Sequence, residues 1–222
     1  GFDYIDYNLI NIIVCPHCLF ASKEKVFFRK DPSESIPDVI NEKRFKQVWL
    51  REIKERKRIF KHPNEIPTIE RSLETVVYSY KIAIEIAKKL GELKFNDEMR
   101  WQAIHLLIAL SEVHMSNRNE TLAIETLTDA HTRAKHLFNN TSNNSIAFKC
   151  ARVLMIWGLY KGQPKEVMPY LNFLQDMKQN KINQLNQTDK LMLNKVFGEM
   201  KRAVENRGDY HKGHLDGFHF IN

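Results

Sequence analysis

The chain of 222 residues is long enough to bury an apolar core of its own, and its 43% hydrophobic and 27% charged residues are the mixture of an ordinary globular protein. Its 8 glycines and 7 prolines exclude a low-complexity or collagen-like chain, and no apolar run approaches the roughly 20 residues that a membrane-spanning helix needs. The net charge of +7 would suit an acidic partner. Three cysteines are too few for a secreted disulfide framework and no signal peptide is visible, so we expect a protein of the reducing cytoplasm.

The first 40 residues carry a pattern unlike the rest of the chain. Leu9–Val14 and Val26–Phe28 are β-prone, and Cys15-Pro16-His17-Cys18 lies between them. This order predicts a strand, a tight knuckle, and then a second strand or the start of a helix. Turn-forming residues between positions 31 and 40 predict a linker. We therefore expect a β-rich knuckle segment with its linker at residues 1–40.

From residue 41 onward, apolar residues recur with the period of an α-helix. Seven helices are predicted, joined by short turns that favour antiparallel neighbours, so the domain at residues 41–207 is expected to be all-α. Residues 208–222 are rich in glycine and histidine and lack this period, which predicts a flexible tail. The predicted buried faces are marked by Phe45, Val48, Trp49 and Ile53; Ile69, Leu73, Val76, Val77, Tyr80, Ile84 and Ala87; Ile104, Leu107, Ile108 and Ser111; Leu122, Ala123, Leu127, Ala130, Ala134 and Leu137; Val167, Leu171, Leu174 and Met177; and Leu193, Val196, Met200 and Val204.

Capping residues set the expected ends of several helices. Gly91 is predicted to close the second helix, and Asn96 to cap the third through its side-chain oxygen. Pro164 suits the first turn of the sixth helix, and Thr188 is expected to cap the seventh. The polar run at residues 139–144 predicts a loop.

The third and fourth helices have the spacing of a tetratricopeptide pair. In such a pair, large residues beside a small one on the first helix face small residues seven apart on the second. The next pair matches this pattern more loosely. We therefore predict a tetratricopeptide-like, right-handed array with degenerate repeats. The matching residues are Leu107, Leu110, Ser111, Ala123, Leu127 and Ala130.

Three stretches together resemble the bacterial domain-of-unknown-function 2225 family over nearly the whole chain. They are Asp3-Tyr4-Ile5-Asp6-Tyr7, the run from Val14 through the knuckle to Ala21, and Tyr80-Lys81-Ile82-Ala83. The resemblance implies a Cys-Pro-x-Cys segment followed by tetratricopeptide-like helices, and it implies no particular activity. Members usually carry a further Cys-x-x-Cys pair upstream, which this sequence does not contain, and often a glycine where this chain has Leu19.

Cys15 and Cys18 are the local arrangement with the most chemical specificity. Two intervening residues let both sulfurs face one point, and a tetrahedral zinc site needs four such ligands. The pair therefore supplies half of a possible structural zinc site. A redox pair and a metal-free turn with two reduced thiols are the alternatives. The remaining ligands could be upstream cysteines, His17, His211, His214 or His219.

Basic residues concentrate in the first predicted helix and favour a second hypothesis. Interspersed glutamates make a solvated helix face the plainest explanation. A nucleic-acid-binding surface, assisted by the cysteine knuckle, is the alternative. Its candidate contacts are Arg51, Lys54, Arg56, Lys57 and Arg58.

Tyr78 and Trp101 lie off the main apolar stripes of their helices, so we single them out as candidate partner contacts. The sequence shows no glycine-rich phosphate loop, nucleophile elbow or paired-carboxylate motif. A metal-dependent enzyme with an open zinc position stays a third possibility. The function expected first is a non-enzymatic scaffold that binds a protein or peptide, since stacked helix pairs form grooves suited to that role.

Overall fold

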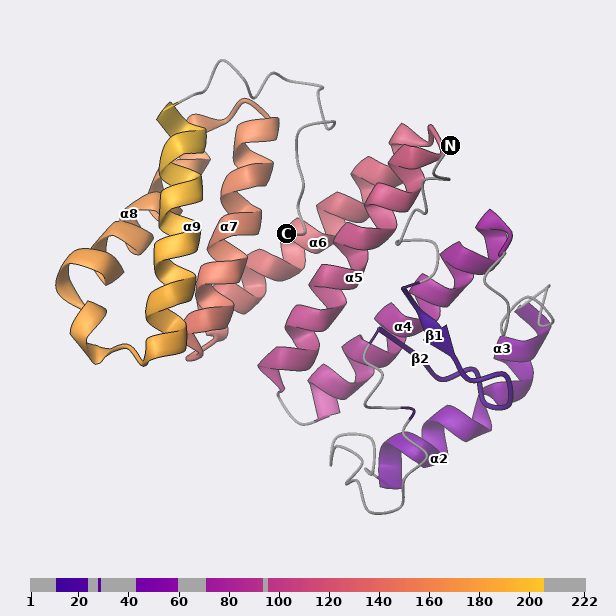
Figure 1. Ribbon diagram of the computed structural model, residues 1–222. Coiled ribbons are helices and arrows are strands. Elements are labelled where there is room, and N and C mark those ends of the chain that lie inside the picture. The colour runs from indigo at the N-terminus through magenta and orange to yellow at the C-terminus, as the bar shows by residue number, and fades with distance from the viewer. Residues whose placement is uncertain (1–10, 24–27, 29–42, 60–70, 94–95, 206–222) are drawn as a thin grey trace, which may run out of the picture. The chain divides into compact units, whose positions relative to one another are not determined.

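The computed structural model describes residues 11–23, 28, 43–59, 71–93 and 96–205 (Figure 1). These residues form a two-stranded antiparallel sheet and a series of α-helices, which confirms the predicted all-α body with a small β segment at its start. None of the helices in these ranges is both long enough and apolar enough to cross a bilayer. In chain order the elements are β1 (Ile13–Val14), β2 (Ala21–Ser22), α2 (Lys43–Arg51), α3 (Ile53–Ile59), α4 (Leu73–Leu93), α5 (Asp97–Ser116), α6 (Glu120–Asn140), α7 (Asn144–Tyr160), α8 (Pro164–Asn180), the 3₁₀ helix η3 (Ile182–Gln184) and α9 (Gln187–Glu205).

The chain folds as two compact units, residues 1–127 and residues 128–222, and the division falls inside α6. The first unit contains the hairpin and helices α2 to α5, and the second contains α7 to α9. The boundaries expected from the sequence, at residues 40 and 207, both lie outside the described residues, as does the tail at 208–222.

The hairpin is shorter and tighter than its sequence pattern predicts. Ile13 pairs with Ser22 and Val14 with Ala21, so the second strand begins three residues after Cys18. Of the stretch Val26–Phe28, expected to be β-prone, only Phe28 is described, and it is not in a strand. The hairpin is short because the turn is tight and brings the chain back beside β1 within a few residues of Cys18. Strand β2 then packs against α4.

The first predicted helix is two short helices, α2 and α3, with a break at Glu52. The backbone carbonyl of Trp49, near the end of α2, accepts a hydrogen bond from the Arg56 guanidinium. A side chain from α3 thus satisfies one of the carbonyls that a helix end leaves open. Phe45 and Trp49 are buried as predicted, with their rings stacked 5.8 Å apart.

Helices α4 and α5 pack closely because α4 presents small residues at intervals of four. Ala83, Ala87 and Gly91 are all buried. Gly91 does not cap the helix, as the sequence predicted, but lies within it. A Cβ atom at Gly91 would come 2.8 Å from Cγ and 3.2 Å from the backbone nitrogen of Arg100. Glycine is therefore required here for the close approach of α5.

Two of the predicted helix starts are confirmed and one is wrong. Asn96 accepts from the backbone nitrogen of Met99 at 3.1 Å, and Pro164 occupies the first turn of α8. The cap of α9 is Asn186 rather than Thr188, since the Asn186 side chain accepts from the backbone nitrogen of Asp189 at 2.8 Å. The helix begins at Gln187, which leaves Thr188 inside its first turn.

The predicted buried faces hold for most positions. Leu122 was placed inward but is 41% exposed, and Leu73 is exposed to the same extent. Each lies within the first three residues of its helix. Helix α6 continues to Asn140, so the loop expected from residue 139 begins two residues later. Ile69 lies outside the described residues.

The second unit is built around α7, which is buried along most of its length and contacts both α8 and α9. Arg152 on α7 and Glu199 on α9 form an ion pair at 2.7 Å, in which the guanidinium donates through both Nε and Nη2. Gly158 allows α8 to approach α7, because a Cβ atom there would lie 2.7 Å from Cγ2 of Val167.

Substitution of Gly158 by alanine is expected to destabilise the second unit by about 1–3 kcal/mol, the usual range for overpacking. Gly198 is a matched control, since it also lies within a helix but nothing stands within 4 Å of its missing Cβ. Gly198→Ala should stabilise by about 0.5–1 kcal/mol, because alanine has the higher helix propensity. Urea unfolding measures the change in stability of each variant. Hydrogen exchange of the α7 amides then shows whether the change lies in α7. Equal effects of the two variants would contradict the close packing.

Candidate functional site

The cysteine knuckle is the turn of the β1–β2 hairpin, drawn in indigo in Figure 1. The Cys15 backbone nitrogen donates to the Phe20 carbonyl, and the Leu19 nitrogen donates to the Cys15 carbonyl, both at 2.8 Å. Leu19 has φ of 54°, in the left-handed region that favours glycine. Its side chain is only 1% exposed, so burial offsets a strain of about 1–2 kcal/mol.

The two thiols are half-buried, form no disulfide, and are unequal in their tendency to ionise. Burial raises the pKa of Cys15. Hydrogen bonds from the backbone of Cys18 and His17, a hydrogen bond with the Cys18 thiol and the charge of Lys57 outweigh it, and the pKa lies below its ordinary value. Burial and the neighbouring Cys15 raise the pKa of Cys18 above its ordinary value. Cys15 is therefore the first of the pair to become a thiolate.

This arrangement fits one half of a thiolate metal site. Backbone N–H groups that donate to a sulfur stabilise its anionic form, which is the form that binds zinc. In the described ranges, the pair is not joined by a third histidine, cysteine or carboxylate at ligand distance. His17 is exposed on the turn itself, and His211, His214 and His219 lie outside those ranges.

The knuckle is held by an aromatic and charged cluster on α2, α3 and α4. The indole nitrogen of Trp49 donates to the Cys18 carbonyl at 3.1 Å. Arg56 lies over the face of the same ring, with Cζ 3.4 Å from its centroid. Glu52 accepts from Arg56 at 3.3 Å and from Lys89 at 2.9 Å, and Lys89 also pairs with Glu85 at 2.8 Å.

The five basic residues chosen from the sequence separate into two groups. Arg51, Lys54, Lys57 and Arg58 are exposed, as a solvated or nucleic-acid-binding face requires. Arg56 is only 7% exposed and is engaged with Trp49 and Glu52, so it is not on that face. Arg56 follows Trp49 by seven residues, a spacing that returns to the same face of a helix, so the helical pattern offered a signal for its burial that the charge pattern concealed.

Tyr78 and Trp101, the predicted partner contacts, are both half-buried. The Lys81 ammonium lies 5.9 Å from the centroid of the Tyr78 ring, and the Trp101 ring stacks on His105 at 6.4 Å. Neither residue lines the pocket found in the same unit. The role of Tyr78 and Trp101 as partner contacts therefore stays a prediction, and it concerns surface outside this pocket.

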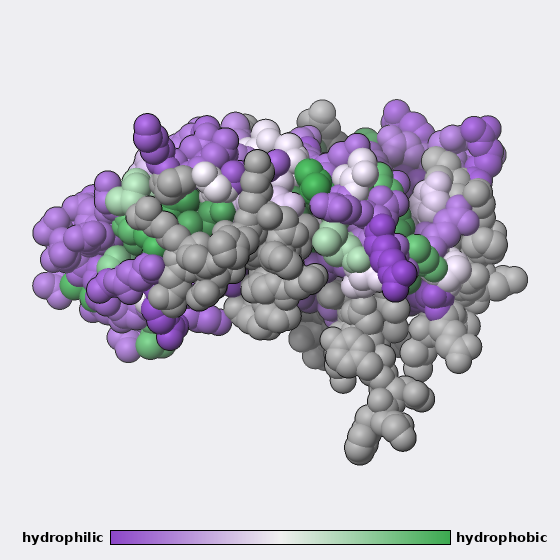
Figure 2. Space-filling model, turned by 90° about the horizontal axis from the view of Figure 1, so that it is seen from above, coloured by the Kyte–Doolittle hydropathy of each residue, from purple (hydrophilic) through white to green (hydrophobic). Residues whose placement is uncertain are grey.

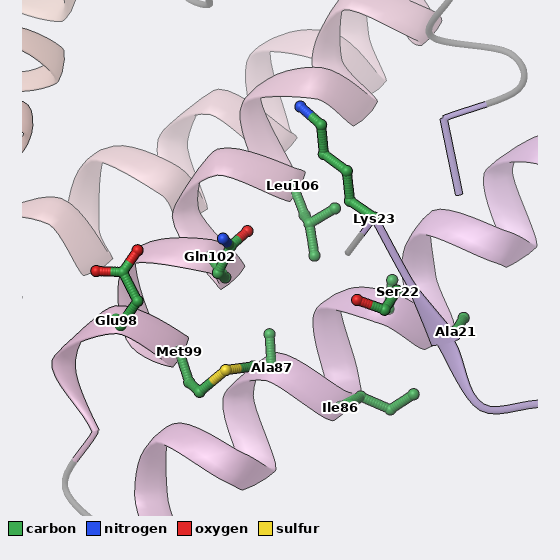
Figure 3. A pocket seen from close by; sticks show the side chains of 10 residues that line it. Ala21, Ser22, Lys23, Ile86, Ala87, Glu98, Met99, Gln102 and Leu106 are labelled. Atoms are coloured by element: carbon green, nitrogen blue, oxygen red, sulfur yellow. The ribbon is translucent and has the colours of Figure 1, made fainter. Parts of the chain in front are cut away.

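A pocket of about 300 Å³ lies where the end of the hairpin meets α4 and α5 (Figure 3). Met99 extends from α5 to Ala87 on α4, and Leu106 points from α5 into the pocket; with Ile86 of α4 they give the pocket an apolar floor. Polar groups stand around this floor. The lining residues are Ala21, Ser22, Lys23, Ala83, Ile86, Ala87, Glu98, Met99, Gln102 and Leu106.

Sequence reasoning missed this pocket because its walls come from residues 21–23, 83–87 and 98–106. The available signal was the small residues Ala83 and Ala87 on the buried face of α4. Small side chains at this spacing predict close helix packing, but they do not reveal that a β-hairpin crosses the same face.

Among the described residues, exposed apolar side chains offer no comparable site. The large ones are scattered over different elements, and hydrophilic residues interrupt the hydrophobic patches on the face seen in Figure 2. Single exposed apolar residues are normal on protein surfaces. Those among the described residues are Leu50, Leu73, Leu122, Met168 and Leu191.

Fold and knuckle together define a helical protein that carries a thiol pair on a short N-terminal hairpin. Over residues 1–205 the sequence matches the family of uncharacterized proteins conserved in bacteria (DUF2225), and the chain belongs to this family. Comparison with curated proteins and with solved structures gives no match. The tetratricopeptide-like, right-handed stacking of the helix pairs accordingly stays a prediction.

Proposed function

We propose that the chain is a non-enzymatic binding module whose pocket receives an apolar side chain from a partner protein or peptide. The pocket between β2, α4 and α5 carries this proposal. Its volume of about 300 Å³ is at the lower end of the range for ligand pockets, which suits a side chain better than a large cofactor. A buried anchor in such a pocket commonly supplies much of the affinity of an interface.

The rim of the pocket can orient what enters it. Lys23 and Glu98 carry opposite charges at different sides of the opening, and Gln102 can donate and accept hydrogen bonds (Figure 3). A peptide whose apolar residue enters the floor would present its own backbone and neighbouring side chains to these groups. The helix-pair fold adds support by analogy, since arrays of such pairs commonly bind peptides.

The knuckle has a structural part in the same proposal. Cys15 and Cys18 would hold a zinc ion together with ligands that lie outside the described residues. Such an ion cross-links the chain around it. Because β2 follows the knuckle directly and lines the pocket through Ala21 and Ser22, a fixed knuckle would fix one wall of the pocket. The proposal places the protein in the cytoplasm, where thiols are kept reduced.

Filling the pocket should remove peptide binding from a protein that still folds, at a cost of about 1–3 kcal/mol because Ala87 also lies at the packed face of α4. A displayed library of random peptides would be selected on the wild type, and the affinities of the selected peptides measured on variants. Ala87→Leu places extra carbons at the apolar floor of the pocket. It should weaken peptide affinity by at least about tenfold, which is the loss expected when one buried contact is removed. Glu98→Lys, on the rim, should change which flanking charges are selected.

Glu92→Lys is the matched control for Glu98→Lys, since it makes the same charge change at an exposed position on α4 outside the lining. Thermal melting of each variant establishes that it is folded. Selected peptides that bind the folded Ala87→Leu variant as tightly as the wild type would refute the pocket. Loss of binding in Tyr78→Ala or Trp101→Ala alone would move the contact to those residues.

A second candidate function is favoured by the four exposed cations on α2 and α3, namely Arg51, Lys54, Lys57 and Arg58. Such a group can neutralise phosphates and release counterions, which is the main source of sequence-independent affinity for nucleic acid. Glu55 reduces the net positive charge of this group, because it pairs with Arg58 at 3.2 Å. This candidate predicts that nucleic acid copurifies with the protein.

A further inference from the structure

Helices α2 and α3 present a cationic face to solvent. Successive residues of an α-helix are turned by about 100°, so the exposed cations of the two helices fall within about 140° of the helix circumference. This arc lies opposite the buried side chains of Phe45 and Trp49. Gln47 and Leu50, the other described residues on the same arc, carry no charge. The cations are Lys43, Lys46, Arg51, Lys54, Lys57 and Arg58.

The break at Glu52 does not interrupt this face. The Glu52 backbone nitrogen donates to the Val48 carbonyl at 3.4 Å, and the Arg56 nitrogen donates to the Glu52 carbonyl at 3.1 Å. Both bonds join residues four apart, as in an α-helix, so the helical phase of α2 is kept in α3. Trp49 and Arg56, seven residues apart, are accordingly both buried. The exposed cations of the two helices therefore share one side of the segment.

The glutamates that interrupt the basic residues in the sequence lie outside this arc. Glu52 accepts from Arg56 at 3.3 Å and from Lys89 of α4 at 2.9 Å. Glu55 stands just beyond one edge of the arc and pairs with Arg58 at 3.2 Å. The face is consequently not the mixture of opposite charges that the sequence suggested. It is a row of cations with one carboxylate at its border.

The cationic face lacks the groups that recognise a single strand or a lipid surface. Single-stranded nucleic acid is bound by stacking of its bases on accessible aromatic rings, but Phe45 and Trp49 are each only 3% exposed. A helix that lies in a membrane surface needs a broad apolar face. In the described part of α2 and α3, Leu50 is the one large apolar side chain that is exposed. Regularly spaced phosphates are the anions that such a face fits best.

The two edges of the arc fit the two walls of a DNA groove. Lys46 and Lys57 lie at one edge and Arg51 and Arg58 at the other, with Leu50 between them. An α-helix with its side chains is about 10–12 Å across, close to the width of about 12 Å of the major groove of B-DNA. The major groove of an RNA duplex is too narrow for side chains to enter. Cations at both edges of the arc would each meet the phosphates of one DNA strand.

We propose that this face of α2 and α3 binds the phosphate backbone of double-stranded DNA independently of base sequence. The inference rests on the second candidate function, and it names the ligand of that surface. The six cations supply the attraction, because each phosphate that they neutralise releases counterions. Arg56 takes no part in the contact, since it is packed against Trp49.

Fluorescence anisotropy of the full-length protein with a short labelled DNA duplex tests the inference. With six phosphate contacts, the affinity should fall by about 10³-fold between about 50 and 200 mM salt. Lys54→Gln and Lys57→Gln should each reduce the slope of log affinity against log salt by about 0.9. Lys165→Gln, the same change at an exposed lysine of α8, should leave the slope unchanged. Glu55→Gln should raise the affinity, because it removes a negative charge beside Arg58.

Other anions, offered to the same protein, separate the failure of this inference from the failure of the second candidate function. A single strand or an RNA duplex bound as tightly as the DNA duplex would refute double-stranded DNA as the ligand and leave nucleic-acid binding standing. Absence of salt-dependent binding to all three would overturn both, and the peptide pocket is still judged by its own variants. Leu50→Gln should leave DNA affinity unchanged. Phosphatidylserine vesicles bound more tightly than DNA, with that binding lost in Leu50→Gln, would assign the face to a lipid surface instead.

Discussion

With zinc held at the knuckle as we propose, Cys18→Ser is expected to abolish stoichiometric zinc binding, with an affinity loss of at least about 100-fold. A serine hydroxyl is a poor zinc ligand, and a tetrahedral structural site depends on all four of its donors. Cys15→Ser should have the same effect, because the proposed site draws one thiolate from each end of the same turn. Metal content by mass spectrometry, and the sulfur-to-metal absorption of the cobalt-substituted protein, measure the loss.

Cys150→Ala is the control for this experiment. Cys150 is fully buried in α7 and belongs to the other unit, so its removal should leave metal content unchanged. Zinc retained at one equivalent in Cys15→Ser and Cys18→Ser would show that the knuckle is a metal-free turn. Zinc lost equally in all three variants would point to a general effect on folding.

Trp49→Ala is expected to undock α2–α3 from the first unit, at a cost of about 3–5 kcal/mol for a fully buried aromatic residue. Trp49 is 3% exposed, stacks on Phe45, supports Arg56 and holds the Cys18 carbonyl. Removal of the ring therefore breaks three contacts at once and leaves a buried cation without its support. Hydrogen exchange of residues 43–59 should rise to the level of an unfolded segment.

Trp49→Phe separates the hydrogen bond from the ring. Phenylalanine keeps an aromatic face for Arg56 and Phe45 but lacks the indole N–H, so a loss of about 1 kcal/mol is expected. Protection of α2–α3 should fall only slightly in this variant. If Trp49→Ala and Trp49→Phe had the same small effect, Trp49 would not be the centre of the cluster.

Much of the helical body follows from local signals in the sequence. The period of the apolar residues predicted the buried faces of α5 and α9, and Asn96 and Pro164 predicted helix starts, because a cap or an N-terminal proline acts on neighbours in the chain. The same logic was wrong for Gly91. A glycine near the end of an apolar stripe resembles a C-cap, and only the position of Arg100 on the next helix shows that it serves packing.

The candidate sites were less predictable because they depend on contacts between distant segments. The spacing of Cys15 and Cys18 is local, so the turn was expected. The contact that holds the turn comes from Trp49, whose indole N–H donates to the Cys18 carbonyl 31 residues away, and no local pattern encodes it. The pocket similarly needs the hairpin to cross the small residues of α4.

The exposed part of the basic segment illustrates the limit of a charge pattern. Five residues of one sign looked equivalent in the sequence, yet Arg56 is buried whereas Arg51 and Lys54 are in solvent. The difference follows from helical phase, since Arg56 stands seven residues after Trp49 and lies over its ring, whereas Arg51 and Lys54 fall on other faces.

Affinity capture of the full-length protein from its native lysate, performed with and without nuclease and in parallel with Ala87→Leu, tests the binding function most directly. Our account predicts a protein partner that the wild type retains after nuclease treatment and that Ala87→Leu loses. A partner retained equally by both proteins would contradict the pocket as its binding site. Recovery of nucleic acid alone, lost on nuclease treatment, would contradict the peptide-binding function and favour the exposed cations of α2 and α3.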